Sequence, residues 1–278
     1  MLPNNPLTQY FRQPAIYIRL PSQGKFYPPG ALNMPPNGEL PILPMTSNDE
    51  ITYRTPDALF NGTATVNVIK SCVPSIRDPW AMPSADLDAV LIGIRIASYG
   101  HVMDISTTCP SCESQEEISV DLRAVNDTMK IGNYDQNLTI SDLEFWFQPI
   151  TYKSVNQNNQ VQMEQQQAMR LLDSDADEQT KLDQLNRSMA VINDTTTNTI
   201  ANSIAAIKTP QAMVTETEFI ADYLRNCDSK IFNQLKEHVI ALKKNSEVKP
   251  LKLACKECNH QYDQPFTLDL SSFFVNAS

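Results

Sequence analysis

The sequence predicts an α+β fold that is mostly helical, with short strands near the N-terminus and two cysteine-containing hairpins that flank a long helical insertion. Three observations support this prediction. Fourteen of the 19 prolines lie in residues 1–83, which favours turns and short extended segments there. Residues 156–245 carry apolar side chains at helical spacing. Two CxxC motifs, at 109–112 and 255–258, each lie between stretches that alternate apolar and polar residues.

The composition is that of a globular protein: hydrophobic residues make up 41% and charged residues 19% of the 278 residues. The formal net charge is −10, and Lys243-Lys244 is the only adjacent pair of basic residues. Proteins that bind nucleic acid usually carry a basic patch or a basic bias. We therefore expect no nucleic-acid partner.

No stretch approaches the roughly 18 apolar residues that are needed to span a bilayer, so we expect no membrane association. The first residues, MLPNNPLTQYFRQ, lack the basic and apolar regions of a secretory signal. In a chain without an export signal, six cysteines indicate reduced thiols or metal ligands rather than disulfides.

Residues 1–55 are predicted to form a Pro-rich extended arm and short strands. Residues 15–22, AIYIRLPS, alternate as a strand does, and 40–45 and 50–54 are expected to be further short extended pieces. Two interpretations stay open for this segment. It forms a small covered sheet, or it is an arm that docks on a neighbouring chain.

Residues 56–100 are predicted to form a helical core segment. In the first helix, Thr55 is the expected N-cap, with Gly62 bending or interrupting the helix. In the second, Ser84 is the expected N-cap and Gly100 the C-terminal glycine. Arg95 lies in an apolar run, and we expect its side chain to reach the surface.

Residues 101–150 are predicted to be the first half of a ribbon-like region, and 251–278 its second half. The insertion between them, 151–250, is expected to be helical at about 160–172, 178–193, 197–207, 215–226 and 229–244. Thr215 with Glu218 resembles a capping box.

The two CxxC motifs have matching surroundings. The first follows MDISTT and precedes EEISVDL, and the second follows LKLA and precedes PFTLDL. A CxxC turn places two thiolates on one side of a hairpin, and two such turns facing each other complete the four-thiolate set of a structural zinc site. The sequence therefore predicts one structural zinc per chain. Its predicted ligands are Cys109, Cys112, Cys255 and Cys258.

This zinc-ribbon-like arrangement is unusual because 142 residues lie between Cys112 and Cys255, whereas a compact ribbon has about 15–20. Three alternatives stay open: His260 replaces one thiolate, the two motifs are redox dithiols, or no metal is bound. Cys72 and Cys227 lie on helical apolar stripes and are interpreted as core thiols.

No catalytic motif is present. The chain has no GxSxG, no Gly-rich phosphate loop and no HExxH, and it has only three histidines. The acidic run 173–178 lacks the glycine and the distal glutamate of a calcium loop. We therefore expect a protein that is not an enzyme and predict no catalytic residues.

Several long stretches resemble one protein family. They run from QYFRQPAIYIRLPSQGKFY (9–27) through LPMTSNDEITYRTPDALFNG (43–62), VIKSCVP (68–74) and DLDAVLIGIRIASYG (86–100) to CPSC, and more loosely to CKEC and LDLSSFF. The chain is similar to the baseplate hub and hub-assembly proteins of T-even-like contractile-tailed bacteriophages. The resemblance covers nearly the whole chain, and RTPDALFNG with VIKSCVP is its most specific part.

The resemblance implies a non-enzymatic structural component or assembly factor of the phage baseplate hub. Its expected partners are other baseplate and tail proteins, and a homo-oligomer around the tail axis is compatible with the symmetry of hubs. The expected location is the virion tail baseplate, assembled in the host cytoplasm. The alternative function is a zinc-ribbon regulatory or nucleic-acid-binding protein, and a dithiol oxidoreductase is a third hypothesis.

Overall fold

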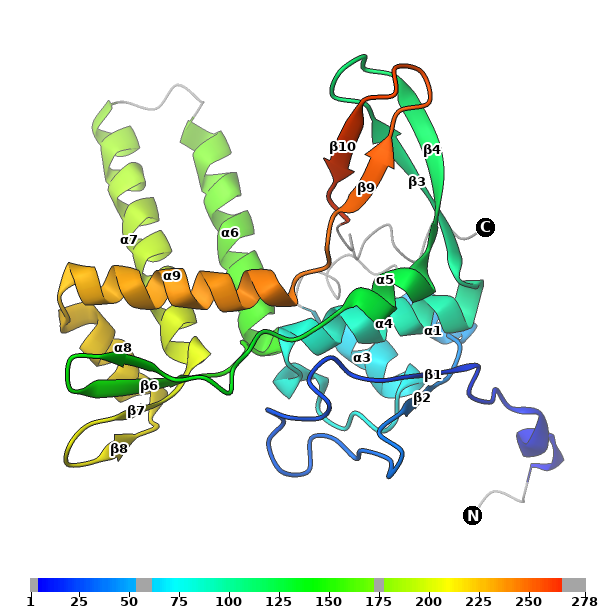
Figure 1. The fold of residues 1–278 in the computed structure, drawn as a ribbon, viewed down its shortest axis with the longest axis horizontal. Coiled ribbons are helices and arrows are strands. Elements are labelled where there is room, and N and C mark those ends of the chain that lie inside the picture. The colour runs from blue at the N-terminus through cyan, green and yellow to red at the C-terminus, as the bar shows by residue number, and fades with distance from the viewer. Residues whose placement is uncertain (1–4, 54–61, 173–177, 267–278) are drawn as a thin grey trace. The chain divides into compact units, whose positions relative to one another are not determined.

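The structure is a computed structural model (Figure 1), and it describes three stretches of the chain: residues 5–53, 62–172 and 178–266. The chain divides into two compact units, each of which is built from separate segments of the sequence. The first unit comprises residues 1–79, 85–130 and 247–278, and the second comprises residues 80–84 and 131–246. Helices together with short antiparallel strands confirm the predicted α+β class.

The first unit contains both cysteine hairpins and the N-terminal segments. Its elements in chain order are η1 (Pro6–Tyr10), β1 (Ile16–Ile18), β2 (Leu40–Ile42), α1 (Ser47–Tyr53), α3 (Thr63–Cys72), α4 (Ser84–Tyr99), β3 (Val102–Thr108), β4 (Gln115–Asp121), α5 (Leu122–Thr128), β9 (Leu251–Ala254) and β10 (Gln261–Gln264). The predicted strands in 15–22 and 40–45 pair with each other, with Ile16 opposite Ile42.

Helix α4 is the central helix of the first unit. Its residues from Ala85 to Arg95 are all buried except the half-buried Asp88. A helix that is buried on every side lies inside a core rather than on its surface. Gly93 allows the β1–β2 pair to approach, because a Cβ at this position would lie 2.5 Å from Cδ1 of Ile42.

The burial of α4 corrects the expectation for Arg95. This side chain is only 2% exposed, and its guanidinium carbon lies 5.5 Å from the centroid of the Tyr99 ring. The apolar stripe in the sequence indicated one buried face, whereas the surrounding elements cover the opposite face as well.

Glycine and capping signals determine the helix boundaries. Gly62 adopts a left-handed conformation (φ 75°) as the N-cap of α3, and Gly100 (φ 91°) follows the end of α4, as predicted. The expected N-cap Thr55 lies outside the described residues. The extended piece expected at 50–54 is wrong for residues 50–53, which belong to helix α1. The helix starts here because the Thr46 amide donates to the Asp49 side chain and the Asp49 amide donates to the Thr46 side chain.

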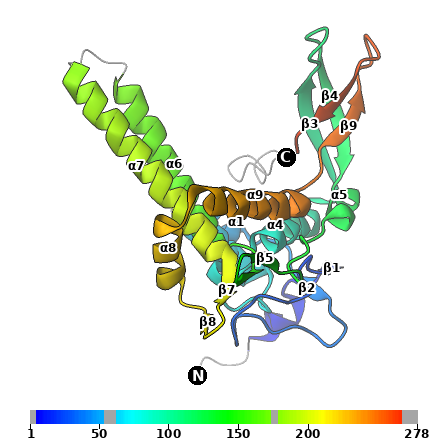
Figure 2. The same ribbon diagram turned by 60° about the vertical axis from the view of Figure 1, so that its left-hand side comes forward.

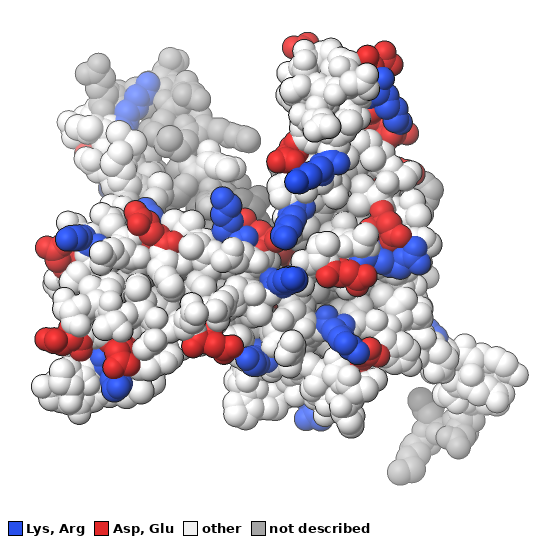
Figure 3. Space-filling model, viewed as in Figure 1, with Lys and Arg blue, Asp and Glu red and all other residues white. Residues whose placement is uncertain are grey.

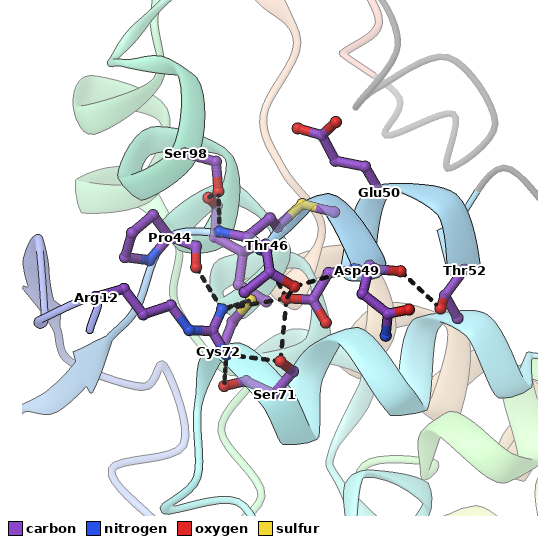
Figure 4. A network of polar contacts seen from close by, with 12 residues as sticks. Arg12, Pro44, Thr46, Asp49, Glu50, Thr52, Ser71, Cys72 and Ser98 are labelled. Carbon is purple, nitrogen blue, oxygen red and sulfur yellow. Dashed lines mark hydrogen bonds and ion pairs between the residues drawn. The ribbon is translucent and has the colours of Figure 1, made fainter. Parts of the chain in front are cut away.

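A partly buried ionic network joins the N-terminal segment to helices α1 and α3 (Figure 4). The guanidinium of Arg12 donates to Asp49 Oδ2 at 3.1 Å, to the Ser71 carbonyl at 2.8 Å and to Ser71 Oγ at 2.7 Å. It also donates to the carbonyl of Pro44. Asp49 in turn accepts hydrogen bonds from the backbone and side chain of Thr46 and from Ser71 Oγ. Because each charge is paired and hydrogen-bonded, the Asp49 carboxylate can be buried while the Arg12 side chain stays partly exposed.

A second buried carboxylate holds the loop after β1 against α4. Asp86 accepts a hydrogen bond from the Ser22 backbone at 2.8 Å, another from the Ser22 hydroxyl, and a third from the Tyr27 hydroxyl at 3.0 Å. Burial raises the pKa of Asp86 to about 6, although these three hydrogen bonds favour the carboxylate.

The second unit is a four-stranded antiparallel sheet with helices. Its elements in chain order are η2 (Pro79–Ala81, whose first residue belongs to the first unit), β5 (Leu138–Ile140), β6 (Leu143–Phe147), α6 (Tyr152–Leu172), α7 (Glu178–Ser203), β7 (Ile204–Lys208), β8 (Met213–Val214), α8 (Thr217–Asn226) and α9 (Ser229–Ser246). The sheet order is β5-β6-β7-β8. Its core includes Phe145, Phe147, Ile204, Ile220 and Leu235.

Two local expectations in this unit are wrong. The helices expected at 178–193 and 197–207 are one helix, α7, and residues 204–208 are strand β7, which pairs with β6 through Phe145 and Ile207. The pairing with a distant strand overrides the local helical pattern. The capping box expected from Thr215 is absent, because the N-cap of α8 is Glu216 without a side-chain hydrogen bond.

Candidate metal centre

The first cysteine motif lies in the turn of the β3–β4 hairpin. Seven residue pairs align the two strands, from Val102 opposite Asp121 to Thr108 opposite Gln115. Side chains alternate between exposed and partly or fully buried positions along both strands. This alternation gives the hairpin one inner and one outer face, and it agrees with the strands predicted around CPSC.

The second cysteine motif lies in the turn of the β9–β10 hairpin. Its register runs from Leu251 opposite Gln264 to Ala254 opposite Gln261. Figures 1 and 2 show the two hairpins side by side with their cysteine turns at the same end. A hydrogen bond of 2.6 Å between the hydroxyls of Thr107 and Tyr262 connects them.

Backbone hydrogen bonds shape the first turn. The Cys109 amide donates to the Ser114 carbonyl at 2.9 Å, and the Glu113 amide donates to the Cys109 carbonyl at 3.0 Å. Glu113 takes the left-handed conformation (φ 59°) that closes the turn. The Ser111 amide points at Cys109 Sγ from 3.4 Å, which is a weak donor contact to sulfur.

The second turn repeats this geometry. The Cys255 amide donates to the His260 carbonyl at 3.0 Å, and the Asn259 amide donates to the Cys255 carbonyl at 2.9 Å. Asn259 has φ 56° at the position that Glu113 occupies in the first turn. The two CxxC segments are therefore two copies of one local structure, although their sequences share only the cysteine spacing.

The four cysteine sulfurs converge between the two turns. Cys109 Sγ lies 3.7 Å from Cys258 Sγ, and Cys112 Sγ lies 3.6 Å from Cys255 Sγ. All four sulfurs lie within 4.8 Å of one another. A tetrahedral ion with bonds of about 2.3 Å to sulfur separates its ligands by roughly 3.8 Å. Two of the six sulfur–sulfur separations match this spacing, none exceeds 4.8 Å, and four thiols are ligands that suit zinc.

Each turn contributes one buried and one exposed cysteine. Cys109 and Cys255 are each 1% exposed, while Cys112 and Cys258 face solvent. Four protein ligands complete a tetrahedral shell and leave no position for a water or a substrate. A metal ion held by all four cysteines would therefore have a structural role rather than a catalytic one.

The local electrostatics favour some thiolates and oppose others. Hydrogen bonds with the side chain and backbone of Ser114 lower the pKa of Cys112 to about 6. A backbone hydrogen bond with His260 favours the Cys258 thiolate, but desolvation and the neighbouring thiols outweigh it and raise the pKa of Cys258 to about 12. Four adjacent thiolates repel one another, and a divalent cation would remove that repulsion.

Groups around the cysteines tie the turns together. Glu116 Oε1 accepts a hydrogen bond of 2.7 Å from the Lys256 amide, which joins the first hairpin to the second turn. Ser114 Oγ lies 3.2 Å from Cys112 Sγ and 3.3 Å from Cys255 Sγ. Ser114 and Glu116 were not identified in the sequence, since nothing in a single hairpin indicates which side chain faces the other hairpin.

The structure brings together the four cysteines that were predicted as ligands, and their binding of a metal stays a prediction. His260, the alternative ligand, is not among the groups that converge within the described residues, and its ring stacks on Tyr262. Cys72 is a buried core thiol as expected. Cys227 is half-buried just after α8, so the expectation of a core position is wrong for this residue.

In the part of the chain that the structure describes, no helix combines the length and apolarity needed to cross a membrane. The model of a family described as "T4 bacteriophage base plate protein" matches residues 34–275, which is most of the chain. No curated protein and no solved structure matches significantly.

Proposed function

Because the chain belongs to the family of T4 bacteriophage base plate proteins, we propose that it acts in the hub region of a contractile-tail baseplate as a structural component or assembly factor. The family match over residues 34–275 carries this proposal. The function consists of protein–protein contacts with other baseplate and tail proteins. No catalytic role is proposed.

A structural zinc is the second part of the proposal. Cys109, Cys112, Cys255 and Cys258 would hold it, and the sulfur separations of 3.6–3.7 Å support a tetrahedral ion. When bound, zinc supplies cross-links between thiolates, and its binding free energy adds to the stability of the folded state.

The position of the cysteines in the chain explains why such a link would be useful. The hairpins belong to the first unit, and residues 131–246 of the second unit lie between them in the sequence. The first unit must therefore assemble from segments that are more than 140 positions apart. Closing so long a loop has a large entropic cost, and a metal link between its ends offsets part of that cost.

The charge distribution also supports a role in protein contacts. On the face that Figure 3 shows, Lys and Arg side chains are interspersed with Asp and Glu. The net charge of −10 points in the same direction. A phosphate backbone is bound by a continuous basic surface. These observations favour the baseplate function over nucleic-acid binding.

The metal is tested by elemental mass spectrometry of the purified full-length chain. We expect about one zinc ion per chain, as for a single four-ligand site. Protein that is purified under reducing conditions with zinc in the medium, and that contains four free thiols at this site and no metal, would contradict the zinc proposal.

The baseplate function is tested in infected cells with an affinity-tagged copy of the chain. We expect the tag to copurify with tail and baseplate proteins, and labelled electron micrographs to place it near the tail axis. Retention in mature particles would indicate a structural component, and presence only in assembly intermediates an assembly factor. A tag recovered apart from every tail intermediate would rule the function out.

A further inference from the structure

Ser114 contacts one candidate metal ligand from each cysteine turn. Its Oγ lies 3.2 Å from Cys112 Sγ, in its own turn, and 3.3 Å from Cys255 Sγ, in the other turn. The two sulfurs are themselves 3.6 Å apart, so the three atoms form a nearly equilateral triangle. The Ser114 hydroxyl is therefore placed to interact with a ligand of either hairpin.

The backbone of the first turn fixes this position. The Ser114 carbonyl accepts a hydrogen bond of 2.9 Å from the Cys109 amide, just before strand β4 begins. The equivalent residue of the second turn is His260, whose carbonyl accepts a hydrogen bond of 3.0 Å from the Cys255 amide. The His260 ring stacks on Tyr262 instead of approaching the sulfurs. The two turns thus share a backbone geometry but differ in the side chain at this position.

The two buried sulfurs differ in the groups around them. Cys109 Sγ is approached by the Ser111 amide at 3.4 Å. Cys255 Sγ contacts other cysteine sulfurs, the Ser114 hydroxyl and the Glu116 carboxylate. Thiolates and carboxylates only accept hydrogen bonds. Among these neighbours of Cys255, the Ser114 hydroxyl is therefore the group that can donate a hydrogen bond when the cysteines are ionised.

A hydroxyl has one proton to donate, and two observations direct it to Cys255. The Ser114 backbone already forms a hydrogen bond that favours the Cys112 thiolate. Cys255 is 1% exposed, so solvent cannot readily supply a donor there. We propose that Ser114 is a positioning residue of the metal centre, whose hydroxyl donates a hydrogen bond to the Cys255 thiolate. This inference rests on the zinc site proposed above and adds a residue to it.

Such a hydrogen bond would have two effects on the centre. Four thiolates around a divalent ion carry a net negative charge, and the Glu116 carboxylate beside Cys255 adds to it. A hydrogen bond from Ser114 draws electron density from the buried sulfur and offsets part of that charge. It also connects a ligand of the second hairpin to the first hairpin. Both effects increase the affinity for zinc.

Competition with a zinc-sensitive chelator tests the effect on affinity in the full-length chain. Ser114→Ala should weaken zinc binding ~10–100-fold, as the loss of a group that hydrogen-bonds to a metal ligand typically does. Ser114→Thr keeps a hydroxyl and should bind nearly as tightly as the wild type. Ser111→Ala is the matched control in the same turn, because Ser111 is exposed and contacts Cys109 through its backbone amide. It should bind as the wild type does.

Cobalt(II) bound in place of zinc gives a readout that a loss of packing alone would not change. The charge-transfer absorption from thiolate to cobalt falls in energy when the sulfur becomes more electron-rich. Ser114→Ala should therefore shift this absorption to longer wavelength. Ser114→Thr and Ser111→Ala should leave it unchanged.

A double-mutant cycle identifies the sulfur that accepts the hydrogen bond. Histidine can replace one cysteine of a zinc site but offers no thiolate to the hydroxyl. In a Cys255→His background, Ser114→Ala should cause little further loss of zinc affinity. In a Cys112→His background, it should cause about the same loss as in the wild type. The reverse pattern, or equal losses in both backgrounds, would overturn the assignment to Cys255.

The failure of this inference and the failure of the zinc proposal give different results. A wild-type chain that takes up neither zinc nor cobalt would overturn both. A wild-type chain that binds zinc, together with a Ser114→Ala variant of equal affinity and unshifted cobalt absorption, would overturn the role of Ser114 alone. Circular dichroism checks that each variant keeps the secondary structure of the wild type.

Discussion

Cys109 Sγ lies 3.7 Å from Cys258 Sγ, although 149 positions of the chain separate the two residues. Each cysteine belongs to a turn that its own hairpin shapes through backbone hydrogen bonds. The contact between the two turns is therefore a tertiary contact between segments that each have local hydrogen bonds of their own. The candidate metal centre therefore lies between two segments of the first unit, 85–130 and 247–278, that are far apart in the sequence.

Replacing one ligand should remove the metal. Mutating a residue that hydrogen-bonds to a metal ligand typically weakens metal binding ~10–100-fold. We expect Cys112→Ser to weaken zinc binding by more than this, because a serine hydroxyl is a poor substitute for a thiolate ligand. Competition with a zinc-sensitive chelator measures the affinity. Cys227→Ser is the control, since Cys227 lies outside the cluster, and it should bind as the wild type does. Equal loss in both variants would mean that the four sulfurs are not the site.

Metal affinity should fall as the pH is lowered. Zinc binds thiolates, so protons compete with it. The pKa of Cys258 is raised to about 12, so binding near pH 8 must already displace its proton. The pKa of Cys112 is lowered to about 6, so this residue adds to the competition only below that pH. The same chelator assay between pH 8 and pH 5 should show a decrease that becomes steeper below pH 6. An affinity independent of pH would exclude thiolate ligands.

Arg12→Ala should destabilise the first unit by about 2–3 kcal/mol, because it leaves the buried carboxylate of Asp49 without its cation. Desolvation raises the pKa of Asp49, but the hydrogen bonds from Thr46 and Ser71 and the charge of Arg12 lower it overall. Urea denaturation measures the effect. Arg19→Ala is the control, because its ion pair with Glu39 is exposed and should contribute less than about 1 kcal/mol. Similar losses in both variants would refute the anchoring role of Arg12.

Asp86 should make the stability of the first unit pH-dependent. Its pKa in the folded protein is raised to about 6 from an ordinary value of 3.8, so the folded state binds a proton more tightly than the unfolded state. The associated stability is present below pH 4 and is lost as the pH rises through 6.

Asp86→Asn removes this titration while keeping the shape of the side chain. The stability of the wild type relative to Asp86→Asn should therefore decrease between pH 4 and pH 7, by an amount on the order of 3 kcal/mol at most. Denaturant curves at several pH values measure the difference. A difference that stays constant across this range would show that Asp86 does not titrate there.

Much of the fold followed from local signals. The strands around CPSC, the strand before CKEC, the N-terminal strands in 15–22 and 40–45, and the glycine at the end of α4 are present as expected. Each depends on alternation, turn residues or backbone conformation within a few positions. The strand after CKEC lies at Gln261–Gln264, ahead of the expected PFTLDL stretch, most of which lies outside the described residues. The division of the chain into five segments, 1–55, 56–100, 101–150, 151–250 and 251–278, stays a prediction.

Other features could not be read from local patterns. Residues 204–208 continue the apolar spacing of α7, yet they form β7 because β6 offers hydrogen-bonding partners. Arg95 is buried because elements distant in the sequence cover the second face of α4. Helix α1 was missed although Thr46 and Asp49 carry a capping signal, since the surrounding prolines and β-branched residues favoured an extended interpretation.

The candidate ligands and the form of each turn follow from the amino-acid sequence, because the hydrogen bonds that shape a CxxC turn lie within one hairpin. Long-range packing determines that the two turns meet, that Glu116 accepts a hydrogen bond from the second turn, and that Arg12 reaches Asp49. These contacts join residues far apart in the chain. Their formation depends on how the core of the first unit packs, which no local spacing records.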